Sequence, residues 1–106
     1  MFIINRENWN VKYVQPYDSA LKHYNQDTYA LGCCNNKDKT IYINNTLRGS
    51  LLKKVLCHEV AHAAMFSYNV DLSYDQEELI ADLLATYGEE IVYITNKIFN
   101  KLREGY

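Results

Sequence analysis

The first half of the chain carries short apolar runs that predict strands. Residues 2–4 are apolar throughout, and residues 9–13 alternate between apolar and polar side chains, as in a half-buried strand. The apolar positions of this second segment are Trp9, Val11 and Tyr13. Further along, Asp18 can cap a short helix over 19–24.

Two further strand-like segments predict a hairpin. Residues 29–34 and 40–44 are rich in residues that favour strands, and the polar segment 35–39 between them is typical of a turn. Within the second strand, Ile41 and Ile43 are two positions apart and therefore share one face. We expect this first half to form an antiparallel sheet or hairpin.

The second half changes to the spacing of helices. Asn45 or Thr46 can cap a helix that runs to about Tyr68. Its apolar residues recur at helical spacing and are Leu51, Leu52, Val55, Leu56, Ala63 and Phe66. Because strands come first and helices follow, the sequence predicts an α+β fold rather than an alternating α/β fold.

A second, longer helix is predicted at the C-terminal end. Ser73 and Gln76 have the spacing of a capping box, so this helix should begin near Gln76. From Ile80 to Leu102 apolar residues recur every three or four positions, through Gly88. We interpret this stripe as the core face of the helix, and the alternative is a surface that pairs with another chain.

Length and composition indicate one globular domain over residues 1–106. The apolar fraction of 48% suits a folded chain, and the net charge of −2 argues against a general nucleic-acid or anionic-membrane surface. No apolar run is long enough for a membrane span or a signal peptide. Three cysteines, Cys33, Cys34 and Cys57, are an odd number and lack a CxxC zinc pattern. We therefore expect a cytoplasmic protein with reduced thiols.

One motif carries chemistry. His58, Glu59 and His62 form an HExxH pattern inside the first predicted helix. Residues four apart lie on one face of a helix, so the two imidazoles can bind one zinc ion. Glu59 projects to the side of that position and can act as the general base on a water molecule. The pattern predicts a zinc-dependent hydrolase.

A catalytic zinc ion needs a third protein ligand, and three acidic residues can supply it. Asp71 lies in the loop after the motif, and Glu77 and Glu78 open the next helix. We favour Glu78, because Asp82 follows it at i+4 and faces the same way. One of these two carboxylates can bind zinc while the other accepts the second N–H group of a zinc-binding histidine. Glu77 is rotated by about 100° and lacks such a partner.

These segments resemble a known family. The motif at 57–62, followed by Glu78-Leu-Ile-Ala-Asp82-Leu-Leu-Ala85, is similar to the gluzincin pattern HExxH…ExxxD, and more narrowly to the ImmA/IrrE-like small metallopeptidases. The resemblance covers roughly residues 29–90. It implies a zincin-like fold, with zinc bound by His58, His62 and Glu78, Glu59 as the base, and Asp82 orienting His58.

The resemblance also implies a substrate class. Members hydrolyse peptide bonds, often in a regulatory DNA-binding protein such as a repressor of a phage or mobile element. The strand at 40–44 would then hold the substrate in extended form. Two alternatives are a catalytically inactive zinc-binding regulator and a helical protein-interaction module. A donor to the developing oxyanion is also expected, and the candidates are Tyr68, Tyr74, Tyr87 and His23.

Overall fold

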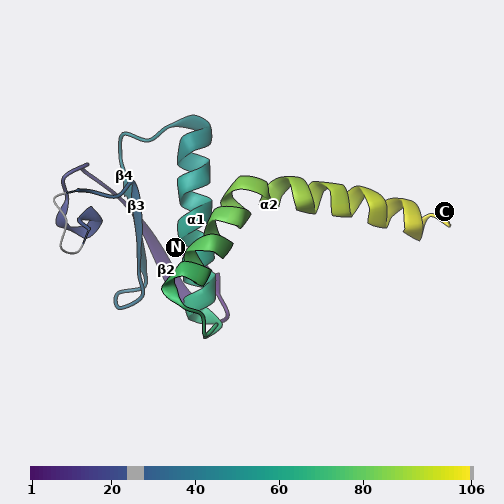
Figure 1. Ribbon diagram of the computed structural model, residues 1–106, viewed down its shortest axis with the longest axis horizontal. Helices are drawn as coiled ribbons and strands as arrows, with labels where there is room; N and C mark the ends of the chain where they lie inside the picture. Colours follow the sequence, from purple (N-terminus) through teal and green to yellow (C-terminus); the bar gives the residue numbers. More distant parts are fainter. Residues whose placement is uncertain (24–27, 106) are drawn as a thin grey trace.

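The computed structural model, which describes residues 1–23 and 28–105, has an α+β fold (Figure 1). Its described residues form a four-stranded mixed sheet and two long helices. The elements, in chain order, are β1 (Phe2–Ile4), β2 (Glu7–Val14), the 3₁₀ helix η1 (Ser19–Leu21), β3 (Gly32–Asn35), β4 (Thr40–Asn44), α1 (Gly49–Ser67) and α2 (Tyr74–Arg103).

The short helix predicted over 19–24 is found as the single turn η1. The Asp18 carboxylate accepts a hydrogen bond from the Ala20 backbone N–H at 2.9 Å, as expected for its cap. Lys22 already has extended backbone angles, so the turn ends there. Tyr24, the last residue of the predicted helix, lies outside the described residues.

The strand order is β1-β2-β4-β3, and the sheet is not wholly antiparallel. β3 and β4 form the predicted hairpin, and β1 and β2 form a second one through Asn5 and Arg6, both at positive φ. β2 and β4, however, are parallel, with Val11 opposite Ile41. The expectation of an antiparallel sheet is wrong at this pair. The long connection from β2 to β4 lets the chain return to the same end of the sheet, which a parallel pair requires.

The core lies between β4 and α1. Ile41 and Ile43 are fully buried on one face of β4, as predicted, and they pack with Trp9 and with Ala63 of α1. Trp9 also donates a hydrogen bond from Nε1 to the Oγ atom of Ser67, at 2.8 Å. This bond ties β2 to the C-terminal end of α1.

Only the first part of β2 contributes to this core. Val11 and Tyr13, expected on the same buried face as Trp9, are 38% and 62% exposed. β1 pairs only with residues 7–9 of β2, so the rest of β2 has no described strand on its outer side. The prediction of a half-buried strand therefore holds at Trp9 and fails beyond it.

The helix α1 begins later than predicted, at Gly49. The Asn44 side chain accepts hydrogen bonds from the backbone N–H and the hydroxyl group of Thr46, at 2.8 and 2.6 Å. These bonds form a local turn, so neither Asn45 nor Thr46 caps the helix. Arg48 occupies the cap position without a side-chain hydrogen bond to the helix.

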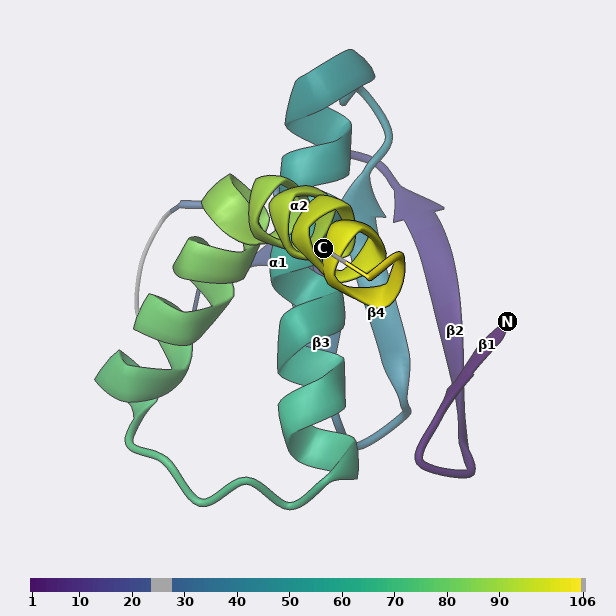
Figure 2. The same ribbon diagram turned by 90° about the vertical axis from the view of Figure 1, so that its right-hand side faces the viewer.

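The helix α2 has the predicted capping box but packs over only part of its length. Ser73 and Gln76 exchange both expected hydrogen bonds, and the helix starts at Tyr74. Ala81 is its one buried residue, packed against Ala61 and Met65 of α1. Figures 1 and 2 show the C-terminal part projecting away from the body, which gives the molecule its longest dimension of 56 Å.

The apolar stripe of α2 is therefore not a core face beyond its first turns. Its last four members are about half exposed or more, and they are Ile91, Ile94, Ile98 and Leu102. The periodicity indicates an amphipathic helix. The body of the molecule, however, is too small to cover the apolar face of a helix of 30 residues. Within the described residues, neither helix is long and apolar enough to cross a membrane.

Candidate metal centre

Two helices bring the candidate residues together. α1 carries His58, Glu59 and His62, and α2 carries the acidic residues of its first turns. The small side chains of Ala61 and Ala81 lie at the contact between the helices. Because neither residue has a bulky side chain, the two helices approach closely enough for side chains from both to meet.

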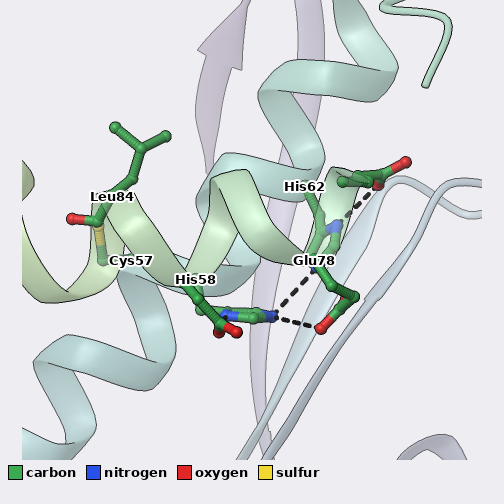
Figure 3. Close-up of polar contacts among 7 residues, drawn as sticks. Cys57, His58, His62, Glu78 and Leu84 are labelled. Carbon is green, nitrogen blue, oxygen red and sulfur yellow. Dashed lines mark hydrogen bonds and ion pairs between the residues drawn. The ribbon is translucent and has the colours of Figure 1, made fainter. Parts of the chain in front are cut away.

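Three donor atoms converge between the helices (Figure 3). The Nε2 atoms of His58 and His62 are 3.1 Å apart. The carboxylate of Glu78 lies 2.7 Å from Nε2 of His62 and 3.4 Å from Nε2 of His58. For a tetrahedral ion with ligands at about 2.0–2.1 Å, the ligand atoms lie roughly 3.3 Å from one another. The separations of 3.1 and 3.4 Å are close to that value, and the contact of 2.7 Å, made by the other carboxylate oxygen of Glu78, is shorter.

The other nitrogen of each ring contacts a second carboxylate. Nδ1 of His58 lies 3.0 Å from Asp82, and Nδ1 of His62 lies 2.7 Å from Glu77. When Nε2 of each ring binds a metal ion, these carboxylates would accept a hydrogen bond from the Nδ1–H group.

This donor set suits a cation. Two imidazole nitrogens and one carboxylate, with contacts of 2.7 to 3.4 Å between them, are a donor set of the kind that binds a divalent metal ion. His58, His62 and Glu78 could therefore hold a metal ion. The contacts of the two Nδ1 atoms with Asp82 and Glu77 would keep each imidazole in the tautomer and orientation that metal binding needs.

The two alternative third ligands are placed differently. Glu77 approaches His62 from the Nδ1 side, so it does not face the point where the donor atoms converge. Asp71 is exposed in the loop between α1 and α2 and is not part of the donor group found among the described residues. The geometry thus brings Glu78, rather than these two, to the histidine pair.

Glu59 is buried beside the donor group. Its exposed fraction is 7%, and burial raises the pKa of its carboxyl group, with a smaller contribution from Glu78. His58, His62 and a hydrogen bond from the Cys34 backbone N–H oppose that shift in pKa. The carboxyl group is therefore held by β3 next to the donor atoms.

Close packing of β3 on α1 produces this arrangement. A Cβ atom at Gly32 would lie 2.9 Å from Cγ1 of Val55 and 3.0 Å from Cγ of Glu59. Both distances are too short for an ordinary contact. The absence of a side chain at Gly32 thus lets the strand reach Glu59.

The donor group lies at the meeting point of two clefts. The larger cleft, of about 580 Å³, is lined by His23 and Tyr74 as well as by the donor residues. Tyr68 and Tyr87, the other candidate oxyanion donors, are 60% and 54% exposed and do not line it. The second cleft, of about 350 Å³, shares Gly32, His58 and Glu59 with the first. The site is therefore approachable from both sides.

The strand next to the site is β3. The order β1-β2-β4-β3 places β4 inside the sheet, where both of its edges are already paired. The expectation that residues 40–44 hold an extended substrate is therefore wrong, because β4 has no free edge. Among the described residues β3 has a free edge, and Gly32, Cys33 and Cys34 of this strand line the larger cleft.

Sequence reasoning missed the role of Glu77. Its side chain is 18% exposed and contacts His62, whereas the i+4 argument considered only the pair Glu78 and Asp82. Glu77 lies four residues before Ala81, the one residue of α2 that is buried against α1. That spacing is the signal that would have placed Glu77 on the face toward α1.

Comparisons with protein-family models, with curated proteins and with solved structures found no match.

Proposed function

We propose that the protein is a zinc-dependent endopeptidase of the zincin type, similar to the ImmA/IrrE-like small metallopeptidases. Its substrate would be a cytoplasmic protein, such as a DNA-binding repressor of a phage or mobile element. The observation that carries the proposal is the convergence of His58, His62 and Glu78 beside the buried carboxyl group of Glu59.

The donor chemistry favours zinc as the metal. Two imidazoles and one carboxylate are a ligand set typical of catalytic zinc, which keeps a fourth position for water or substrate. When bound, zinc would supply Lewis acidity, which lowers the pKa of a water molecule to about 7 and polarises the scissile carbonyl group. His58 and His62 would be kept in the binding tautomer by Asp82 and Glu77.

Glu59 has the position of a general base. Its carboxyl group, buried beside the histidines, would take a proton from the attacking water and give it to the leaving amine. The hydrogen bond from the Cys34 backbone N–H would orient it during both transfers. A binding module without catalysis has no need for a buried carboxyl group at this place, which favours the enzyme over the inactive regulator.

The free edge of β3 suits an extended peptide. A substrate segment can pair with an unpaired strand edge through main-chain hydrogen bonds. Because clefts lie on both sides of His58 and Glu59, the segment could continue in both directions from the cleaved bond. This favours cleavage within a chain over removal of a terminal residue. His23 and Tyr74 in the larger cleft are the candidate oxyanion donors.

The test combines metal content with cleavage. Protein purified without chelator is analysed by elemental mass spectrometry and incubated with a mixture of peptides blocked at both ends. We expect one zinc ion per chain and internal cleavage products. Glu59→Gln should keep the zinc and lose cleavage, whereas Glu78→Ala should lose most of the zinc.

Asp71→Asn is the matched control, because it removes an exposed acidic residue from the loop between the helices and should change neither quantity. Absence of zinc after reconstitution would contradict the metal site. Zinc without cleavage of the peptides or of candidate repressors would favour the inactive regulator. Cleavage that survives Glu59→Gln would remove Glu59 as the base.

A further inference from the structure

The projecting part of α2 carries an unpartnered apolar stripe. Tyr87, Ile91, Ile94 and Ile98 follow one another at intervals of four, three and four residues. Their exposed fractions lie between 47% and 55%. Alternation of this kind is the pattern of a helix that packs along another helix.

The charge of this segment does not suit a membrane surface. Residues 88–105 contain Lys97, Lys101 and Arg103, together with Glu89, Glu90 and Glu104, so their charges cancel. Binding to anionic lipid requires an excess of basic residues beside the apolar face. The stripe is therefore better suited to protein than to lipid.

We propose that α2 pairs antiparallel with α2 of a second copy of this chain, forming a twofold dimer. In this register Ile91 lies opposite Ile94 of the second copy, and Tyr87 lies opposite Ile98. The next position of the pattern is Lys101, whose aliphatic stem can extend the apolar face of the helix. Each contact occurs twice because of the twofold symmetry.

Charge complementarity supports this register. Glu90 and Lys97 each immediately precede a core position, so in the antiparallel pair Glu90 lies opposite Lys97 of the second copy, twice. Glu90 forms no ion pair within the described residues, and Lys97 lies over the ring of Tyr93, with Nζ 5.4 Å from its centre. On the other flank, Gly88 lies opposite Thr95, which places no charge against the apolar residues.

A parallel pair lacks these matches. There each core residue meets its own copy, so Lys101 would face Lys101. Glu90 would face Thr95, and Lys97 would face Leu102, so neither charge would meet an opposite one. The distribution of charge thus distinguishes the two directions.

The size of the surface and the shape of the molecule both permit the dimer. Four half-exposed side chains and Leu102, counted on both copies together, offer on the order of 1,000 Å² for burial, which is where specific interfaces begin. Figures 1 and 2 show the body at one end of the projecting helix. Antiparallel pairing would place the two bodies at opposite ends, away from each other.

The test is a charge exchange followed by analytical ultracentrifugation. The unmodified chain should show a monomer–dimer equilibrium that depends on concentration. Glu90→Lys and Lys97→Glu should each weaken self-association by about tenfold or more, because each change creates two like-charge contacts. A mixture of the two single variants should form heterodimers about as strongly as the unmodified chain associates, and the double variant should also recover.

Asn96→Glu is the matched control, because it adds a charge on the outer face of the same helix turn and should leave association unchanged. Ile94→Asp should abolish the dimer while zinc content and helix content stay the same. A monomer at every concentration, an assembly larger than a dimer, or single variants whose mixture stays monomeric would each overturn the proposal. None of these outcomes bears on the metal site, which is measured separately.

Discussion

Glu77 Oε1 lies 2.7 Å from Nδ1 of His62, and this contact has a counterpart in the pair formed by Asp82 and His58. Each imidazole of the candidate metal centre therefore contacts a carboxylate of α2 through its Nδ1 atom. The two contacts differ in exposure, because the side chain of Glu77 is 18% exposed and that of Asp82 is 69% exposed. Solvent competes far more with the second contact than with the first.

We predict that Glu77→Ala weakens zinc binding more than Asp82→Ala does. Loss of a carboxylate behind a ligating histidine typically costs about 10–100-fold in metal affinity. The loss of affinity should lie near the upper end of this range for Glu77→Ala and near the lower end for Asp82→Ala. Competition with a chromogenic chelator measures both affinities. Asp75→Asn, a change in the exposed first turn of α2, serves as the control; equal losses in the two variants would reject the ranking by exposure.

We predict opposite effects of alanine at two glycines. Gly32→Ala would force a Cβ atom against Val55 and Glu59, so it should destabilise the protein by about 1–3 kcal/mol. At Gly88 the nearest atom to an added Cβ is 3.6 Å away, in Leu84, so Gly88→Ala should stabilise the helix by about 1 kcal/mol. Urea denaturation at low protein concentration measures both. Equal stability of Gly32→Ala and the unmodified chain would show that β3 can move away from α1.

The cysteines should differ in reactivity. Burial raises the pKa of Cys34 to about 12, with a further contribution from Glu59, whereas Cys57 is exposed. The thiolate is the reactive form, so at pH 8 Cys34 has about a thousandth of the thiolate of a thiol with the ordinary pKa of 9.0. Iodoacetamide followed by peptide mass spectrometry should label Cys57 first. Labelling of Cys34 should rise as pH approaches 12, and early labelling of Cys34 at pH 8 would contradict its burial.

The hydrogen bond between Trp9 and Ser67 should matter for stability. Ser67→Ala leaves the buried indole N–H group without its acceptor, which should cost about 1–3 kcal/mol. The chain has one tryptophan, so its fluorescence reports unfolding directly. Ser50→Ala, at an exposed position of α1, is the control and should change the free energy of unfolding by less than about 0.5 kcal/mol.

Features that depend on local spacing could be predicted from the sequence. Ile41 and Ile43 alternate within one strand, and Ser73 and Gln76 lie one helical turn apart, so neighbours along the chain determine both arrangements. The same holds for His58 and His62, whose i, i+4 spacing brings two nitrogen atoms to within 3.1 Å. None of these required knowledge of how the elements pack together.

Features that depend on packing between distant elements could not be predicted in the same way. The parallel pairing of β2 with β4 follows from the path of the intervening chain, and the spacing of apolar residues does not indicate the direction of pairing. The spacing to Ala81 indicates that Glu77 faces α1, but which histidine it contacts depends on how the two helices pack together. The stripe from Ile91 to Leu102 shows which face of the helix is apolar, but its exposure depends on what lies beside it.

The single buried residue of α2, Ala81, has a consequence for motion. With so little apolar area against α1, this helix would separate from the body at a free energy well below that of global unfolding. An ion held jointly by α1 and α2 would add its binding free energy to that cost. Amide hydrogen exchange in the first turns of α2 would then slow as metal binds, so the residues that hold the ion would also set how often the two helices part.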